Sequence, residues 1–178
     1  MTGAVVRTEL VIDEVRYSVH HLPDARLSDV LRDELNFRHV HVSCAEGECG
    51  ACTILLDGVP VTSCLVLAAQ AAGKKITTVA GLAPPGQLHP VQQAFIEEQA
   101  FQCAFCTPGF IMSAVAFLRE NPDPGLEDAA DAMSGNICRC GAHPFIVRAV
   151  LTAAEKLRGV ETSRRTPYAV IPMPEEES

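Results

Sequence analysis

The sequence predicts an α+β protein built from two small domains. Its eight cysteines fall into two blocks, and no cysteine lies between Cys64 and Cys103. That gap contains the breaker cluster Gly81-Leu-Ala-Pro-Pro-Gly86, where we place the domain boundary. The first half alternates strand and helix patterns, whereas the second half shows only helical periodicity. We therefore expect a mixed domain over residues 1–80 and a four-helix bundle over residues 81–160.

The first domain is predicted from alternating apolar residues and from turn signals. Alternation predicts one strand over Val6–Ile12 and another over Val15–Val19, with Asp13-Glu14 turning the chain between them. Leu27 to Leu35 follows helical spacing, and Asp57-Gly58 is a strong hairpin signal. The other expected elements are strands over 53–56 and 59–61, a short helix over 65–72 and a last strand over 76–79.

The second domain is predicted from helix start signals. Pro90 suits the first position of a helix, and Thr107 is expected as an N-cap followed by Pro108. The helix that begins there should end near Glu120, before a proline-rich stop. A short helix near 126–133 and a last one, opened by Pro144 and reaching about 157, complete the bundle.

The tail over residues 161–178 has no periodicity. It contains three prolines and an acidic end. We expect it either to be disordered or to be an extended arm that lies on a partner.

Composition excludes several classes of function. Twenty-two acidic residues against 14 Lys and Arg give a net charge of −8, which argues against a nucleic-acid binder. No segment is long and apolar enough to span a membrane, and no signal peptide is recognisable. The expected location is therefore the cytoplasm, where thiols are usually reduced or bound to metal.

The first cysteine block has the spacing of a plant-type [2Fe-2S] site. Cys44-x4-Cys49-x2-Cys52 is followed by Cys64 after eleven residues. Small residues in the loop allow it to curl and to turn backbone N–H groups towards sulfur. A Zn(Cys)4 site usually has two C-x2-C pairs, and this block has one. A Rieske centre would need two histidines, but four cysteines complete the site, so we interpret His39 and His41 as ordinary surface or strand residues.

The second cysteine block consists of Cys103-x2-Cys106 and Cys138-x-Cys140. Each pair lies just before a predicted helix start, where unpaired N–H groups and the helix dipole favour an anionic cluster. Arg139 adds positive charge. Alone, this block could also bind zinc, but its place beside the first block favours a second iron–sulfur cluster.

Together, the two blocks resemble the small iron–sulfur subunit of the xanthine oxidase family of molybdenum hydroxylases. That family includes the small subunits of carbon monoxide dehydrogenase and of bacterial aldehyde and N-heterocycle dehydrogenases. The matching stretches are residues 44–53, 102–110 and 134–141. The resemblance implies a β-grasp, plant-type ferredoxin domain, a four-helix domain, and one [2Fe-2S] cluster on each, held by Cys44, Cys49, Cys52 and Cys64 and by Cys103, Cys106, Cys138 and Cys140.

The resemblance also implies a function, that of an oxidoreductase subunit that transfers electrons. Electrons would pass from molybdopterin on a large subunit through the helical-domain cluster to the ferredoxin-type cluster, and then to an FAD-binding subunit or a cytochrome. Gln102 matches a glutamine that hydrogen bonds the pterin, although it could simply be a solvated loop amide. We expect no catalytic residue on this chain, because its six histidines are scattered.

Two departures from the family pattern and two alternative functions remain. Ala104 stands where the family usually has Gly. The position should tolerate the methyl group of alanine unless its φ is positive. His143 replaces an aromatic residue, which leaves the substrate open. The alternatives are a free-standing two-cluster ferredoxin and a zinc-stabilised interaction module.

Overall fold

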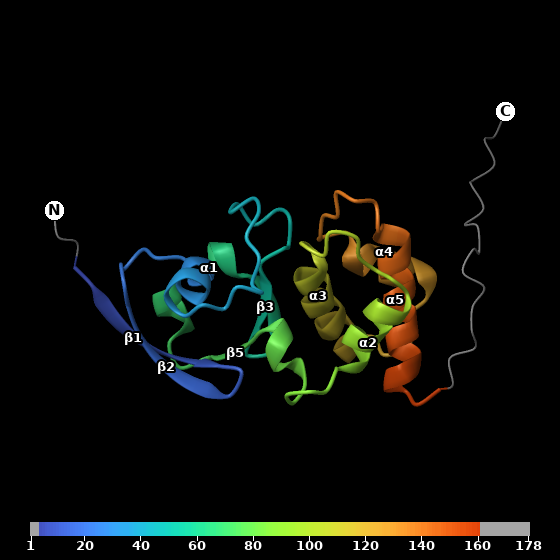
Figure 1. The fold of residues 1–178 in the computed structure, drawn as a ribbon, viewed down its shortest axis with the longest axis horizontal. Helices are drawn as coiled ribbons and strands as arrows, with labels where there is room; N and C mark the ends of the chain where they lie inside the picture. The colour runs from blue at the N-terminus through green and yellow to red at the C-terminus, as the bar shows by residue number, and fades with distance from the viewer. Residues whose placement is uncertain (1–3, 161–178) are drawn as a thin grey trace.

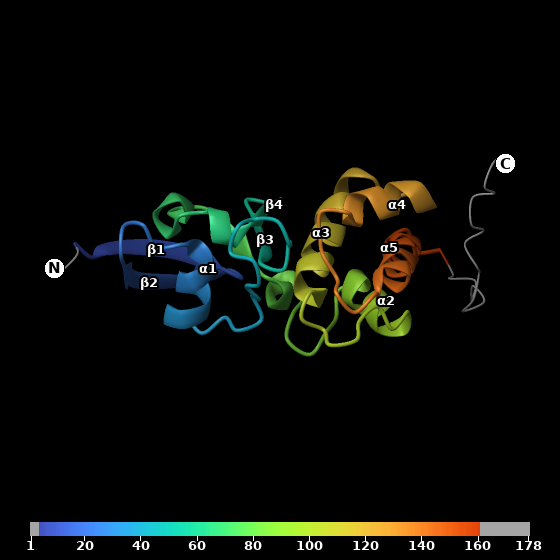
Figure 2. The same ribbon diagram turned by 90° about the horizontal axis from the view of Figure 1, so that it is seen from above.

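The computed structural model describes residues 4–160, which form two lobes side by side (Figures 1 and 2). The N-terminal lobe contains the sheet, and the C-terminal lobe contains four helices. The predicted tail over 161–178 lies outside the described residues. Within the described part of the chain, no helix is long and apolar enough to cross a membrane.

The N-terminal lobe is a β-grasp, as predicted. Its five-stranded sheet has the order β2-β1-β5-β3-β4, in which β1 pairs parallel with β5 and the other pairs are antiparallel. The short helix α1 (Leu27–Asp29) continues into the π-helical turn η1 (Val30–Glu34) and packs into the same core as the sheet. The strands are β1 (Val6–Ile12), β2 (Val15–His21), β3 (Thr53–Leu56), β4 (Val59–Thr62) and β5 (Lys75–Thr77).

The helix predicted over 65–72 is wrong. The segment instead forms two 3-10 turns, η2 (Ser63–Leu65) and η3 (Ala68–Ala71), with an extended link between them. In that link Val66 O accepts a hydrogen bond from Leu27 N, and Ala68 N donates to Ala25 O. Backbone groups used in this way cannot close a continuous helix. The last strand is also shorter than predicted, because the Thr78 side chain caps a further 3-10 turn, η4 (Val79–Leu82).

The C-terminal lobe contains the four predicted helices around one core. They are α2 (Pro90–Glu97), α3 (Thr107–Glu120), α4 (Leu126–Met133) and α5 (His143–Leu157). The predicted cap of α3 is wrong by one residue. Cys106 is the N-cap and Thr107 is the first helical residue, so the Thr107 hydroxyl caps nothing.

Strand β3 separates the two hydrophobic cores. All four of its residues are buried, because both faces of the strand are covered. Ile54 and Leu56 belong to the core of the β-grasp lobe, whereas Leu55 belongs to the core of the helical lobe. Helix α3 lies beside β3 (Figure 1). The two lobes therefore pack against each other through β3 and α3, and this interface brings their cysteine loops together.

Candidate iron–sulfur sites

The first thiol set comprises Cys44, Cys49, Cys52 and Cys64. The loop that holds three of them curls through left-handed backbone at Ala45, Gly47 and Gly50, with φ of 57°, 84° and 68°. A Cβ atom at Gly47 would lie 2.3 Å from a methyl carbon of Leu65, but that side chain is exposed and can turn aside, so the positive φ is what favours glycine there. The β3–β4 hairpin then returns the chain to Cys64, which is buried with Cys49 and Cys52.

The thiols of the first set meet in two pairs. Cys44 hydrogen bonds with Cys49, and Cys64 hydrogen bonds with Cys52. Backbone N–H groups point at the sulfurs, and the Glu46 N–H donates to Cys44 Sγ at 3.4 Å. That bond and further N–H groups lower the pKa of the Cys44 thiol. The loop is thus built to stabilise negative charge on sulfur.

The second thiol set also meets in two pairs, drawn from two segments of the helical lobe. Cys103 lies with Cys140, with 3.4 Å between their sulfurs, and Cys106 hydrogen bonds with Cys138. Helix α3 begins directly after Cys106, and α5 begins soon after Cys140. The backbone N–H groups of residues 140–142 hydrogen bond to the Cys138 thiol. The predicted placement beside two helix N-termini is confirmed.

The donor set fits [2Fe-2S] clusters. Each iron of such a cluster takes two thiolates, and each thiol set supplies two pairs. Within residues 4–160, no three His, Cys, Asp or Glu side chains are arranged to hold one metal ion. Burial and a neighbouring thiol raise the pKa of Cys64 and of Cys106. Such thiols become thiolates when a cation compensates their charge, as iron does.

Comparisons with known proteins agree with these sites. A family described as "2Fe-2S iron-sulfur cluster binding domain" matches residues 10–79, and one described as "[2Fe-2S] binding domain" matches residues 78–151. The chain is 47% identical over 134 residues to the nicotinate dehydrogenase small FeS subunit of Eubacterium barkeri, covering 75% of this chain and 85% of that protein. It is 42% identical over 149 residues to the xanthine dehydrogenase iron-sulfur-binding subunit of Escherichia coli O157:H7, covering 82% and 92%.

A solved structure agrees as well. Quinoline 2-oxidoreductase from Pseudomonas putida 86 contains a chain that superposes with a TM-score of 0.83 at 38% identity, covering 89% of this chain and 99% of that one. This chain is a small iron–sulfur subunit of the xanthine oxidase family of molybdenum hydroxylases. It is an oxidoreductase subunit with an electron-transfer role.

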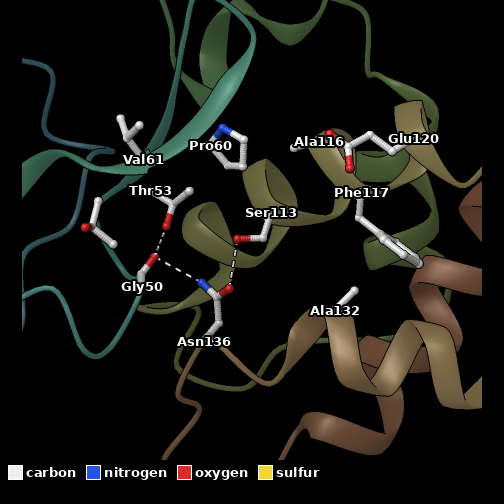
Figure 3. Close-up of a pocket in the computed structure, with 12 residues that line it drawn as sticks. Gly50, Thr53, Pro60, Val61, Ser113, Ala116, Phe117, Glu120, Ala132 and Asn136 are labelled. Carbon is white, nitrogen blue, oxygen red and sulfur yellow. Dashed lines mark hydrogen bonds between the residues drawn. The ribbon is translucent and has the colours of Figure 1, made fainter.

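In this small subunit, hydrogen bonds join the two segments that carry the thiol sets. Ile137 N donates to Cys49 O at 3.0 Å, and Asn136 Nδ2 donates to Gly50 O at 3.0 Å. Ser113 Oγ of α3 donates to Asn136 Oδ1 at 2.8 Å, which orients the amide (Figure 3). Asn136 is buried at the interface between the lobes. The segment that precedes Cys138 is therefore fixed to the loop that follows Cys49.

Close backbone packing reinforces this junction. A Cβ atom at Gly109, in the first turn of α3, would lie 2.2 Å from Gly50 O and 3.0 Å from the Cα of Ala51. Both neighbours are backbone atoms, which cannot turn aside as a side chain can. Glycine at 109 therefore lets helix α3 approach the first cysteine loop closely.

The structure changes the interpretation of three residues near the second thiol set. Gln102 is exposed, but its Nε2 donates to Cys140 O at 2.9 Å, so it is not simply a solvated amide. Ala104 has a φ of 61°, where a residue other than glycine costs about 1–2 kcal/mol. His41 contacts Phe105 across the lobe boundary. No sequence pattern signals this last contact, because the partners lie 64 residues apart.

Proposed function

We propose that this small subunit passes electrons singly from a molybdopterin site on a large partner subunit to an FAD-binding subunit or a cytochrome. The observation that carries the proposal is the hydrogen bond from Ile137 N to Cys49 O. It links a residue next to Cys138 of the second thiol set with a cysteine of the first. A chain that holds two redox centres in contact through its backbone is suited to conduct electrons between them.

We propose that each thiol set holds one [2Fe-2S] cluster. When bound, the clusters supply centres that accept and release one electron at a time. The protein keeps the thiolates in place and directs N–H groups at their sulfurs, as the Glu46 N–H does towards Cys44. The proposed ligands are Cys44, Cys49, Cys52 and Cys64 for one cluster and Cys103, Cys106, Cys138 and Cys140 for the other.

The difference in exposure between the two thiol sets supports a direction of transfer. Cys103 is exposed, whereas Cys49, Cys52 and Cys64 are buried. The helical lobe therefore has its thiol set at the surface, where a large molybdopterin-binding subunit could approach it. We propose that electrons enter there and continue towards the β-grasp lobe, with the domain boundary near residue 80.

Gln102 is the proposed pterin contact. Its bond to Cys140 O holds the exposed amide beside the second thiol set. We expect Gln102→Ala to leave both clusters intact and to slow electron exit from molybdenum, measured by rapid mixing of the assembled enzyme with substrate. The matched control is Gln93→Ala, which removes an amide that also donates to a backbone carbonyl at 2.9 Å, that of Leu88. Equal rates in the two variants would show that Gln102 does not contribute to electron exit from molybdenum.

The substrate of the complex is proposed from the names of the relatives. Nicotinate, xanthine and quinoline are all N-heteroaromatic compounds. We propose that the complex oxidises a compound of this class. Turnover of the purified complex with nicotinate, xanthine or quinoline, but not with benzaldehyde, would support this assignment, and the reverse would contradict it.

The decisive experiment is purification from the native host through a tag on this chain, followed by metal analysis and identification of co-eluting proteins. Iron together with molybdenum and a large partner would support the proposal. Iron on a lone chain would instead indicate a free-standing two-cluster ferredoxin, and zinc without iron would indicate an interaction module.

A further inference from the structure

His41 forms a contact that crosses from one lobe to the other. Its ring stacks on that of Phe105, with ring centroids 4.7 Å apart and an angle of 18° between the planes. Its Nδ1 donates a hydrogen bond of 2.6 Å to Phe105 O. The histidine precedes the first cysteine loop, whereas Phe105 lies between Cys103 and Cys106. Two independent interactions thus fix one residue of the second loop from the β-grasp lobe.

Apart from the contacts of its thiols and of Gln102 with the segment around Cys138 and Cys140, the loop that receives this contact gains little from burial. Cys103, Ala104 and Phe105 are all exposed, so little apolar burial stabilises their conformation. Ala104 is in the left-handed region at φ 61°, where its Cβ is unfavourable. Within the loop, a hydrogen bond of 3.3 Å from Thr107 N to Ala104 O closes the turn.

The position of Phe105 decides the surroundings of Cys103. The Phe105 N–H hydrogen bonds to the Cys103 thiol and is the largest cause that lowers the pKa of that thiol. The Phe105 carbonyl, on the other side of the same residue, accepts the His41 bond. Fixing the carbonyl and the ring of Phe105 fixes the position of its backbone nitrogen, which restricts where its N–H can point. His41 acts on Cys103 without touching it.

We propose that His41 is a positioning residue for the second thiol set, which offsets the backbone strain at Ala104 and so holds Cys103 in its ligating position. The inference rests on the proposed ligand role of Cys103. It assigns a function to a side chain that belongs to the other lobe and to no thiol set.

The test uses the full, cluster-loaded chain and follows each cluster by its electron paramagnetic resonance signal while a chelator removes iron. We expect His41→Ala to accelerate loss of the second cluster about tenfold, as removal of a strong hydrogen bond and a ring contact would do, and to alter its reduction potential. The first cluster should be unaffected. Equal acceleration for both clusters, or none, would overturn the proposal.

A control in the segment before Cys44, which also carries His41, is His39→Ala. His39 Nε2 donates to Thr78 Oγ1 at 2.8 Å and does not bond to the Cys103–Cys106 loop. The variant therefore loosens the segment before Cys44 without releasing Phe105. We expect the second cluster to be lost at the wild-type rate. A tenfold acceleration here would mean that any loosening of this segment suffices, which would overturn the assignment to His41.

The role of strain is tested by Ala104→Gly, which keeps every side-chain hydrogen bond of the loop. Glycine adopts a positive φ without the Cβ penalty, so the single variant should lose the second cluster about two- to fivefold more slowly. In this background His41→Ala should have less than about one third of its original effect. An unchanged rate for Ala104→Gly, or a full effect of His41→Ala within it, would overturn the proposal. A first cluster that is lost in every variant would instead count against the proposed function.

Discussion

The two thiol sets are chemically alike but differ in how the chain builds and covers them. The first comes from a short stretch, 44–64, and three of its four cysteines are buried. The second joins two segments of the helical lobe and has an exposed cysteine at 103. The first set is thus the more deeply buried of the two, although its Cys44 is only half-buried, as are Cys106, Cys138 and Cys140 of the second.

The largest effect is expected when one proposed ligand of the second site is removed. Cys103→Ser or Cys138→Ser should abolish the second cluster and stop turnover of the complex, because a serine hydroxyl is a poor substitute for a thiolate. The plant-type spectrum of the first cluster should remain. Absorbance and paramagnetic resonance spectra of the purified chain measure both clusters at once. Retention of both clusters in either variant would refute the ligand assignment.

Removal of metal should separate the sites by rate. In the isolated chain, we expect a chelator to take iron from the second site about tenfold faster than from the first, because exposed segments open at a lower free energy. Addition of the large subunit should slow the second rate and leave the first unchanged. Equal rates in the isolated chain would show that the difference in exposure has no consequence.

The close packing of α3 against the first cysteine loop should be disrupted by one added methyl group. Gly109→Ala forces a Cβ against Gly50 O and the Cα of Ala51, and overpacking of this kind costs about 1–3 kcal/mol. We expect a lower unfolding temperature of the cluster-loaded chain and slower electron transfer between the clusters. Gly135→Ala is the matched control, because nothing lies within 4 Å of a Cβ there. A control as damaging as Gly109→Ala would contradict the assigned contact.

The smallest effect is expected for the amide that joins the two loops. Asn136→Ala removes the bond to Gly50 O, and since Thr53 Oγ1 also donates to that carbonyl at 2.7 Å, the loss should be about 1 kcal/mol. Ser113→Ala keeps the bond between the loops and should cost less. Thermal unfolding of the two variants measures the difference. A greater loss for Ser113→Ala would mean that the serine has a role beyond orienting Asn136.

Sequence reasoning succeeded where the signals were local. The helix over 126–133 has the predicted ends, since strong breakers precede it and its periodicity is clear. The cysteines of each block come together, although their role as ligands remains a prediction. The helix over 65–72 failed because its backbone bonds to Ala25 and Leu27, and nothing within the segment itself reveals those partners.

What could not be predicted lies at the boundary between the lobes. The contact of His41 with Phe105 and the bond of Ile137 to Cys49 depend on how two domains pack, which no periodicity encodes. The sequence could not show whether the φ of Ala104 is positive, because alanine gives no sign of left-handed backbone. The one-residue error at Thr107 goes against the local rule, because the residue before a proline favours the extended backbone of an N-cap, whereas Thr107 is the first helical residue.

The separation of the second site along the chain has a consequence for biosynthesis. A polypeptide emerges from the ribosome N-terminus first, and domains generally fold as units in that order. The thiols of the first site are therefore available while Cys138 and Cys140 have yet to be synthesised. Closing the second site must wait for α4 and for the loop closure that brings residue 140 back to residue 103. The thiol set of the β-grasp lobe can therefore assemble before that of the helical lobe, and Ile137 reaches Cys49 only after α4 has been made.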